Sequence, residues 1–269
     1  MNHIGLLRQT TLFRHFSDGE LAEFAQGAIL RRLSRHETLV YEGQESKSLF
    51  VLMKGSVRLY FEGYDGREQV ISVVQGVGTF NELILFDGGL QPFSISACEE
   101  SVVLCLRAGQ IRQKFSDSLH PAADALQLVA AQLRGALDLV RSLSLLDVAQ
   151  RLAHFPLDYA EHHGSRCPDG IHVRLDLSNQ EIGESVGAVR EVISRAMARL
   201  QKSGLIVCSG KALVIPDETL LSQFIGKRQR RESVHTSVIS MASSDSLALR
   251  PRRGPVIPVA RRVISERHD

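Results

Sequence analysis

Four polar side chains around position 190 have the types and the spacing needed to bind the edges of DNA bases. Arg190, Glu191, Ser194 and Arg195 lie close together, and positions 191, 194 and 195 become neighbours on one face of a helix. An arginine can bind guanine through two hydrogen bonds, a glutamate can accept one from a cytosine or adenine amino group, and a serine can bond a phosphate or a base edge. We therefore predict that this face contacts DNA. The alternative is a solvated helix face with an Arg–Glu pair.

The residues around these four predict the helix that presents them. Residues 178–181 spell Ser-Asn-Gln-Glu, a capping box that begins a short helix over residues 179–185. After a turn at Gly187, a longer helix is predicted over Ala188–Lys202, and Gly204 suits its C-cap. The apolar face of the longer helix is expected to pack in a core and comprises Ile193, Ala196, Met197 and Leu200.

A hairpin is predicted directly after the longer helix. Two apolar runs flank the turn residues Ser209-Gly210-Lys211. Helix, turn, helix and hairpin is the order of a winged helix-turn-helix, whose second helix enters the major groove. Ser178 and Gln180, at the start of the first helix, belong to the predicted DNA interface as well.

Residues 38–108 have the pattern of many short β-strands. Apolar runs alternate with turn residues such as Glu42-Gly43, Lys54-Gly55, Asp65-Gly66 and Asp87-Gly88. No helical segment long enough for a parallel βαβ crossover lies between them. We expect a sandwich or barrel-like roll, which places the chain in the α+β class.

A long helix is predicted between the two regions, over residues 121–145. Its apolar residues recur at alternating spacings of three and four, which is the pattern of a coiled-coil seam. The predicted seam comprises Leu126, Val129, Leu133, Ala136, Val140 and Leu143. We expect it to pair two copies of the chain, and the alternative is an amphipathic helix packed on its own domain.

The positive charge of the chain is concentrated at its C-terminal end. From residue 226 onward ten Lys/Arg stand against four Asp/Glu, a charge of +6, while the rest of the chain carries −4. We expect a disordered basic tail that adds sequence-independent attraction to phosphates. The alternative is a tail that only solubilises the protein.

Composition excludes several classes of protein. The 269 residues lack a membrane-spanning apolar stretch and an N-terminal secretory signal, so we expect a cytoplasmic protein. The four cysteines, Cys98, Cys105, Cys167 and Cys208, form no CxxC pair. Since no nucleophile elbow, phosphate-binding loop or pair of catalytic carboxylates is evident, we do not expect an enzyme.

Three segments make the chain resemble the CRP/FNR family of bacterial transcription regulators. They are VLMKGSVRLY through GTFNELILF (residues 51–86), LSLLDVAQRLAHF (residues 143–155) and LSNQEIGESVGAVREVISRAMARLQKSGLI (residues 177–206). The resemblance covers roughly residues 10–225 and is most specific in the helix-turn-helix. It implies an N-terminal cyclic-nucleotide-binding-type β-roll, a long dimerisation helix and a C-terminal winged helix-turn-helix.

The resemblance also implies how DNA is recognised. The FNR-like branch uses Glu-x-x-Ser-Arg, matched here by Glu191, Ser194 and Arg195, and the cyclic-AMP branch uses Arg-Glu-x-x-x-Arg, matched by Arg190, Glu191 and Arg195. The implied site is a palindrome of TTGAT-like half-sites, with TGTGA as the alternative. The implied partners are double-stranded DNA, a second copy of the chain and RNA polymerase.

The sensor region departs from the family's cyclic-AMP pocket. Where the family has Gly-Glu-Leu, this chain has Asn81, Glu82 and Leu83, and where the family has Arg-Ser it has Pro92 and Phe93. Neither Pro92 nor Phe93 can neutralise a cyclic phosphate, which argues against cyclic AMP. These five positions are the predicted effector pocket, and the departures are more like the nitric-oxide-responsive and FixK-like branches.

The cysteines and histidines indicate which other cofactors the chain could bind. An FNR-type iron–sulfur cluster is excluded because no cysteine precedes Cys98. Haem held by a histidine stays open, and the candidates are His3, His15 and His36. No metal site is predicted, because the spacing of the nearest set matches no zinc pattern; that set is His154, His162, His163 and Cys167.

The predicted organisation has four parts. They are a β-roll sensor at 10–120, a dimerisation helix at 121–145, a winged helix-turn-helix at 146–225 and a basic tail at 226–269. The predicted function is a homodimeric, DNA-binding transcription regulator controlled through the roll by a signal other than cyclic AMP. The alternative is a ligand-binding sensor whose helix-turn-helix acts mainly in protein contacts.

Overall fold

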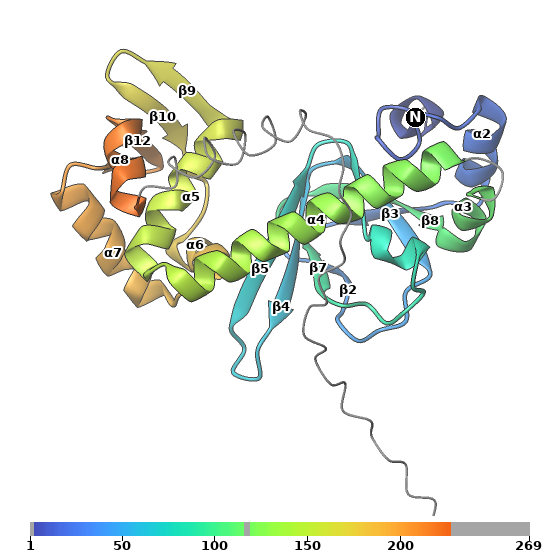
Figure 1. The fold of residues 1–269 in the computed structure, drawn as a ribbon, viewed down its shortest axis with the longest axis horizontal. Helices are drawn as coiled ribbons and strands as arrows, with labels where there is room; N and C mark the ends of the chain where they lie inside the picture. Colours follow the sequence, from blue (N-terminus) through green and yellow to red (C-terminus); the bar gives the residue numbers. More distant parts are fainter. Residues whose placement is uncertain (1–2, 116–118, 227–269) are drawn as a thin grey trace, which may run out of the picture. The chain divides into compact units, whose positions relative to one another are not determined.

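The computed structural model describes residues 3–115 and 119–226, without the side chains of residues 161–163. The predicted basic tail lies almost entirely outside the described residues. The described part combines a strand-rich N-terminal region with a long helix and a helical C-terminal region, as the α+β prediction required (Figure 1). None of the described helices has both the length and the apolar character needed to cross a membrane.

Antiparallel strands build the N-terminal region, confirming the predicted roll. They are β1 (Ile29–Leu33), β2 (Thr38–Val40), β3 (Ser48–Lys54), β4 (Ser56–Glu62), β5 (Glu68–Gln75), β6 (Gly78–Phe80), β7 (Ser94–Ala97) and β8 (Ser101–Arg107). They form two sheets with the orders β1-β8-β3-β6 and β2-β7-β4-β5. The core between the sheets takes side chains from both, including the stacked rings of Phe50 and Phe80.

Strand β3 is apolar along almost its whole length because both of its faces are covered. Phe50 and Leu52 belong to the core between the sheets. Leu49, Val51 and Met53 point the other way, into a second core shared with the N-terminal helices. Side chains alternate along a strand, so a strand buried on both faces needs a continuous apolar run.

Helices α1 (His3–Leu7), α2 (Asp18–Gln26) and α3 (Ala108–Lys114) supply the second core. Two short strands, β1 and β6, were not expected from the sequence. β1 is an edge strand with four of its five residues exposed, so it lacks the alternating pattern that marks a half-buried strand. β6 has only three residues.

Helix α4 (Leu119–Leu145) is the long green helix of Figure 1, and α5 (Val148–His163) follows it. The Gly, Ser, Pro and Asp residues of the segment 162–170 predict a loop, and this prediction is wrong for most of its length. α5 continues to His163, and β9 (Gly164–Cys167) pairs with β10 (Gly170–Arg174). All four residues of β9 are exposed, so its sequence gave no periodic pattern.

The C-terminal region contains the helix-turn-helix and its sheet. Its further elements are α6 (Asn179–Val186), α7 (Arg190–Lys202), β11 (Val207–Ser209), β12 (Ala212–Ile215) and α8 (Glu218–Ile225). The strands form a sheet of order β11-β12-β10-β9. One core joins this sheet to α5, α6, α7 and α8, and it includes Ile193, Ala196 and Leu200 of the predicted apolar face.

Candidate nucleic-acid interface

The capping box predicted at the start of α6 is present. Ser178 Oγ accepts a hydrogen bond from the Glu181 N–H at 3.2 Å, and the Ser178 N–H donates to Glu181 Oε2 at 2.7 Å. Burial raises the pKa of Glu181, but the hydrogen bonds from Ser178 and the pair with Arg35 outweigh it and hold that pKa below 4.5. Ser178 and Gln180 are both exposed at this end of the helix.

The turn between α6 and α7 depends on two glycines. Gly187 has a φ of 74°, in the left-handed region that favours glycine, and ends α6. Gly183 lies so close to the turn that a Cβ atom there would stand 2.3 Å from the Ala188 carbonyl oxygen. The first helix and the turn can therefore pack closely only with glycine at position 183.

Arg151 of α5 binds the turn between α6 and α7, a role that was not predicted from the sequence. Its guanidinium donates to the carbonyl oxygens of Val186 at 2.8 Å, Gly187 at 3.2 Å and Leu146 at 2.8 Å. These oxygens lie at the ends of two helices, where carbonyl groups lack helical partners. One side chain thus satisfies three backbone groups and fixes the turn against α5.

Helix α7 presents the four predicted DNA-binding side chains to solvent. Arg190, Glu191, Ser194 and Arg195 are all exposed and together line one open depression of the surface. Within the described part of the chain, none of the four side chains takes part in an ion pair or a side-chain hydrogen bond. The alternative Arg–Glu pair is therefore not formed, and these donors and acceptors are available to a ligand.

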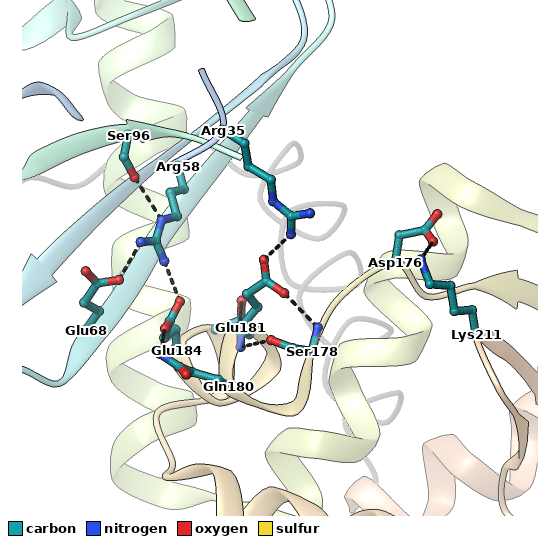
Figure 2. Close-up of polar contacts among 11 residues, drawn as sticks. Arg35, Arg58, Glu68, Ser96, Asp176, Ser178, Gln180, Glu181, Glu184 and Lys211 are labelled. Carbon is teal, nitrogen blue, oxygen red and sulfur yellow. Dashed lines mark hydrogen bonds and ion pairs between the residues drawn. The ribbon is translucent and has the colours of Figure 1, made fainter. Parts of the chain in front are cut away.

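Helix α6 is also joined to the roll by partly buried charges (Figure 2). Arg58 of β4 donates to Glu184 of α6 at 2.5 Å and lies 2.6 Å from Glu68 of β5. The side chains of Arg58 and Glu184 are only 15% and 13% exposed, so this pair is largely removed from water. Arg58 also donates to Ser96 Oγ at 3.0 Å and lies over the Tyr60 ring.

Two further contacts join α6 to the roll. Arg35 donates to Glu181 at 2.6 Å, and the Gln69 amide donates to the carbonyl oxygens of Glu184 at 3.2 Å and Ser185 at 3.4 Å. We call these contacts, together with the Arg58–Glu184 pair, the sensor–reader contact, the sensor being the roll and the reader the helix-turn-helix. Its partners lie more than 100 residues apart in the sequence, so no local pattern could have revealed them.

The predicted effector pocket contains a buried polar cluster. Asn81, at a φ of 70°, donates to the Ser48 carbonyl oxygen and accepts from the Gln91 side chain, both at 3.1 Å. Glu82 is 1% exposed and accepts from Thr79 and from Gln132 of α4, both at 2.5 Å. Gln91 and Gln132 were not singled out from the sequence.

The other predicted pocket residues are apolar or lie at the surface. Phe93 is buried, Leu83 is half-buried and Pro92 is exposed. None of them offers a positive charge to a cyclic phosphate. The residues present therefore do not fit cyclic AMP in the manner of the family's pocket.

Known protein families match both halves of the chain. Residues 30–118 match the cyclic nucleotide-binding domain, and residues 150–224 match the Crp-like helix-turn-helix domain. The cAMP-activated global transcriptional regulator Vfr of Pseudomonas aeruginosa is 32% identical over 190 residues, which are 69% of this chain and 88% of Vfr. The CRP-like cAMP-activated global transcriptional regulator of Mycobacterium tuberculosis is 28% identical, over 70% of this chain and 84% of that protein.

Solved structures share the fold. FixK2 from Bradyrhizobium japonicum superposes with a TM-score of 0.63 at 21% identity, over 73% of this chain and 96% of that one. A CooA mutant from Carboxydothermus hydrogenoformans gives 0.66 at 20% identity, over 79% and 92% of the two chains. Together with the two domain matches and the identity to Vfr, the exposed recognition helix leads to one conclusion: the chain belongs to the CRP/FNR family and is a DNA-binding transcription regulator.

Proposed function

We propose that the chain binds a palindromic DNA site as a homodimer, with the N-terminal half of each α7 in a major groove. The observation that carries this proposal is the single depression lined by Arg190, Glu191, Ser194 and Arg195, all exposed and without protein partners in the described residues. Ser178 and Gln180 lie at the edge of the same interface. The half-site is TTGAT-like, with TGTGA as the alternative, and the two half-site centres lie about 10–11 base pairs apart.

The exposed apolar strip of α4 supports the homodimer. Leu126, Leu133 and Val140 of the predicted seam are each 59–61% exposed, and Leu143 is 38% exposed. Val129 and Ala136 lie between them and are partly buried. A line of large apolar side chains in water is typical of a surface that a partner covers, and the heptad spacing fits a second copy of the same helix.

The signal reaches the roll by a chemistry other than cyclic-AMP binding. Support comes from Pro92 and Phe93, which replace the residues that would hold the phosphate, and from the buried Asn81–Gln91 pair. Haem bound by a histidine is a second candidate; of the three histidines considered, His15 lies 3.5 Å from Asp124 and beside His120.

The sensor–reader contact is the proposed route from the roll to DNA. It joins β4 and β5 of the roll directly to α6, and α6 carries the turn that orients α7. A shift of β5 would therefore move the recognition helix. As a transcription regulator of this family, the DNA-bound dimer would act through RNA polymerase.

Substitution of Arg195 tests direct recognition of bases. We expect Arg195→Ala to lose about 1–3 kcal/mol on the selected site and much less on random DNA, because a base contact is lost. Fluorescence anisotropy with both DNAs measures this. Lys202→Ala removes the same charge from the last turn of α7 and serves as the control. Equal losses on both DNAs would mean that Arg195 contacts only phosphates.

The same titration distinguishes DNA binding from the second candidate function, in which the chain is a ligand-binding sensor. If the wild-type chain failed to bind any DNA at low salt, a role of the helix-turn-helix in protein contacts would be favoured instead.

A further inference from the structure

The hairpin of β9 and β10 brings together three side chains that can bind a metal ion. Cys167 ends β9, Asp169 lies in the turn and His172 lies on β10. The cysteine sulfur, a carboxylate oxygen and an imidazole nitrogen all lie within 4.8 Å of one another. His172 Nε2 is 2.9 Å from Asp169 Oδ1, so two of the three groups are already in contact.

The register of the hairpin explains why these side chains converge. Ser165 lies opposite His172, and Cys167 lies opposite Gly170. Residues two apart on a strand share a face, so Cys167 lies on the face of Ser165 and diagonally across from His172. Opposite the cysteine only glycine fits, because a Cβ atom at Gly170 would stand 2.3 Å from the Ile215 carbonyl oxygen.

We propose that Cys167, Asp169 and His172 form a binding site for a divalent transition-metal ion, with Zn²⁺ the best fit. Thiolate, imidazole and carboxylate are the groups that bind Zn²⁺, at about 2.0–2.3 Å. Ligand atoms of a tetrahedral site are then about 3.3–3.8 Å apart, so small side-chain rotations complete the geometry. Three protein ligands leave the fourth position open to water or another ligand.

These three ligands differ from the candidate metal ligands named in the sequence analysis, with which they share only Cys167. The sequence predicted no metal site, because the set nearest to one, His154, His162, His163 and Cys167, matches no zinc pattern in its spacing. His154 instead lies 3.5 Å from Asp158 on its own helix. The three ligands have the spacing Cys-x-Asp-x-x-His across a turn. This spacing brings them together only because residues 164–167 form a strand that pairs with β10.

The exposure of the site makes it accessible without unfolding. The side chains of Asp169 and His172 are 68% and 42% exposed, and Cys167 is exposed as well. A bound ion would cross-link the end of β9 to β10. It would thereby stabilise the edge of the sheet that supports the helix-turn-helix.

Titration of the full-length chain with Co²⁺ tests the proposal. We expect one equivalent to bind with thiolate-to-cobalt charge-transfer absorption and visible bands typical of tetrahedral Co²⁺, and Zn²⁺ to displace it. Cys167→Ser should abolish the charge-transfer band, while His172→Ala and Asp169→Asn should each weaken binding by about tenfold or more. Cys208→Ser is the matched control and should bind as the wild type does.

The spectra separate this site from thiol binding in general. If the wild type showed no charge-transfer band, or if the band survived in His172→Ala with unchanged affinity, the proposal would be overturned. Loss of the band in Cys208→Ser but not in Cys167→Ser would overturn it as well. Far-UV circular dichroism of each variant verifies that the fold is retained.

Discussion

At the scale of single residues, the proposed DNA recognition depends on side chains that form no ion pair or side-chain hydrogen bond within the described part of the protein. Arg190, Glu191, Ser194 and Arg195 contribute little to the fold, because they are exposed and have no side-chain partners among the described residues. Their positions are set instead by the backbone, through Gly183, Gly187 and the residues that hold the turn. A DNA-binding residue and a positioning residue should therefore respond differently to substitution.

Arg151 is the clearest positioning residue. We expect Arg151→Met to destabilise the C-terminal region by about 1.5–3 kcal/mol, because three carbonyl oxygens lose a charged donor. Urea denaturation followed by circular dichroism measures the free energy of unfolding. Arg199→Met, on the exposed side of α7, is a control that should change stability by less than about 0.5 kcal/mol. A similar small loss in Arg151→Met would show that the turn does not depend on it.

At the scale of elements, local sequence patterns were sufficient to predict the helix-turn-helix. They were insufficient to predict its contacts with the roll. The capping box at Ser178, the turn at Gly187 and the apolar face of α7 are set by residues a few positions apart, so the sequence predicted them. Strands β1 and β9 were missed because they are exposed edge strands. The ion pair of Arg58 and Glu184 was missed because only the tertiary fold brings β4 and α6 together.

The buried Arg58 pair allows a direct test of the sensor–reader contact. Arg58→Met leaves Glu68 and Glu184 as partly buried carboxylates without their cationic partner, and we expect a loss of about 1–3 kcal/mol in the free energy of unfolding. Glu184→Gln should cost much less in the Arg58→Met background than in the wild type, since its partner is already gone. Additive losses, within about 0.5 kcal/mol, would indicate that the two residues do not interact in solution.

The seam of α4 predicts the oligomeric state. Leu133→Glu places a charge in the middle of the proposed seam, where burial against a second helix would be costly, so we expect a monomer under conditions in which the wild type is a dimer. Sedimentation velocity measures this. Ala131→Glu adds the same charge on the opposite side of the heptad and should remain dimeric. A dimeric Leu133→Glu would place the interface elsewhere.

At the scale of the whole molecule, the roll and the helix-turn-helix region differ in how much of their chemistry can be predicted from the sequence. The fold of each half and the family were predictable, because both follow periodic patterns and a specific helix-turn-helix. The effector was not, since the pocket region contains hydrogen bonds of Asn81 and Gln91 within the roll and one bond from Gln132 of α4 to Glu82. These hydrogen bonds cannot be predicted from local sequence patterns, because only the tertiary fold brings their partners together.

In the proposed complex, two copies of α7 recognise the two halves of a palindrome. Selection of bound sequences from random DNA, followed by hydroxyl-radical footprinting of the selected site, tests this recognition. We expect an inverted repeat of TTGAT-like or TGTGA-like half-sites, protected in two segments whose centres are about 10–11 base pairs apart. A single unrepeated half-site, or no enriched sequence at all, would show that two copies of α7 do not recognise a palindrome.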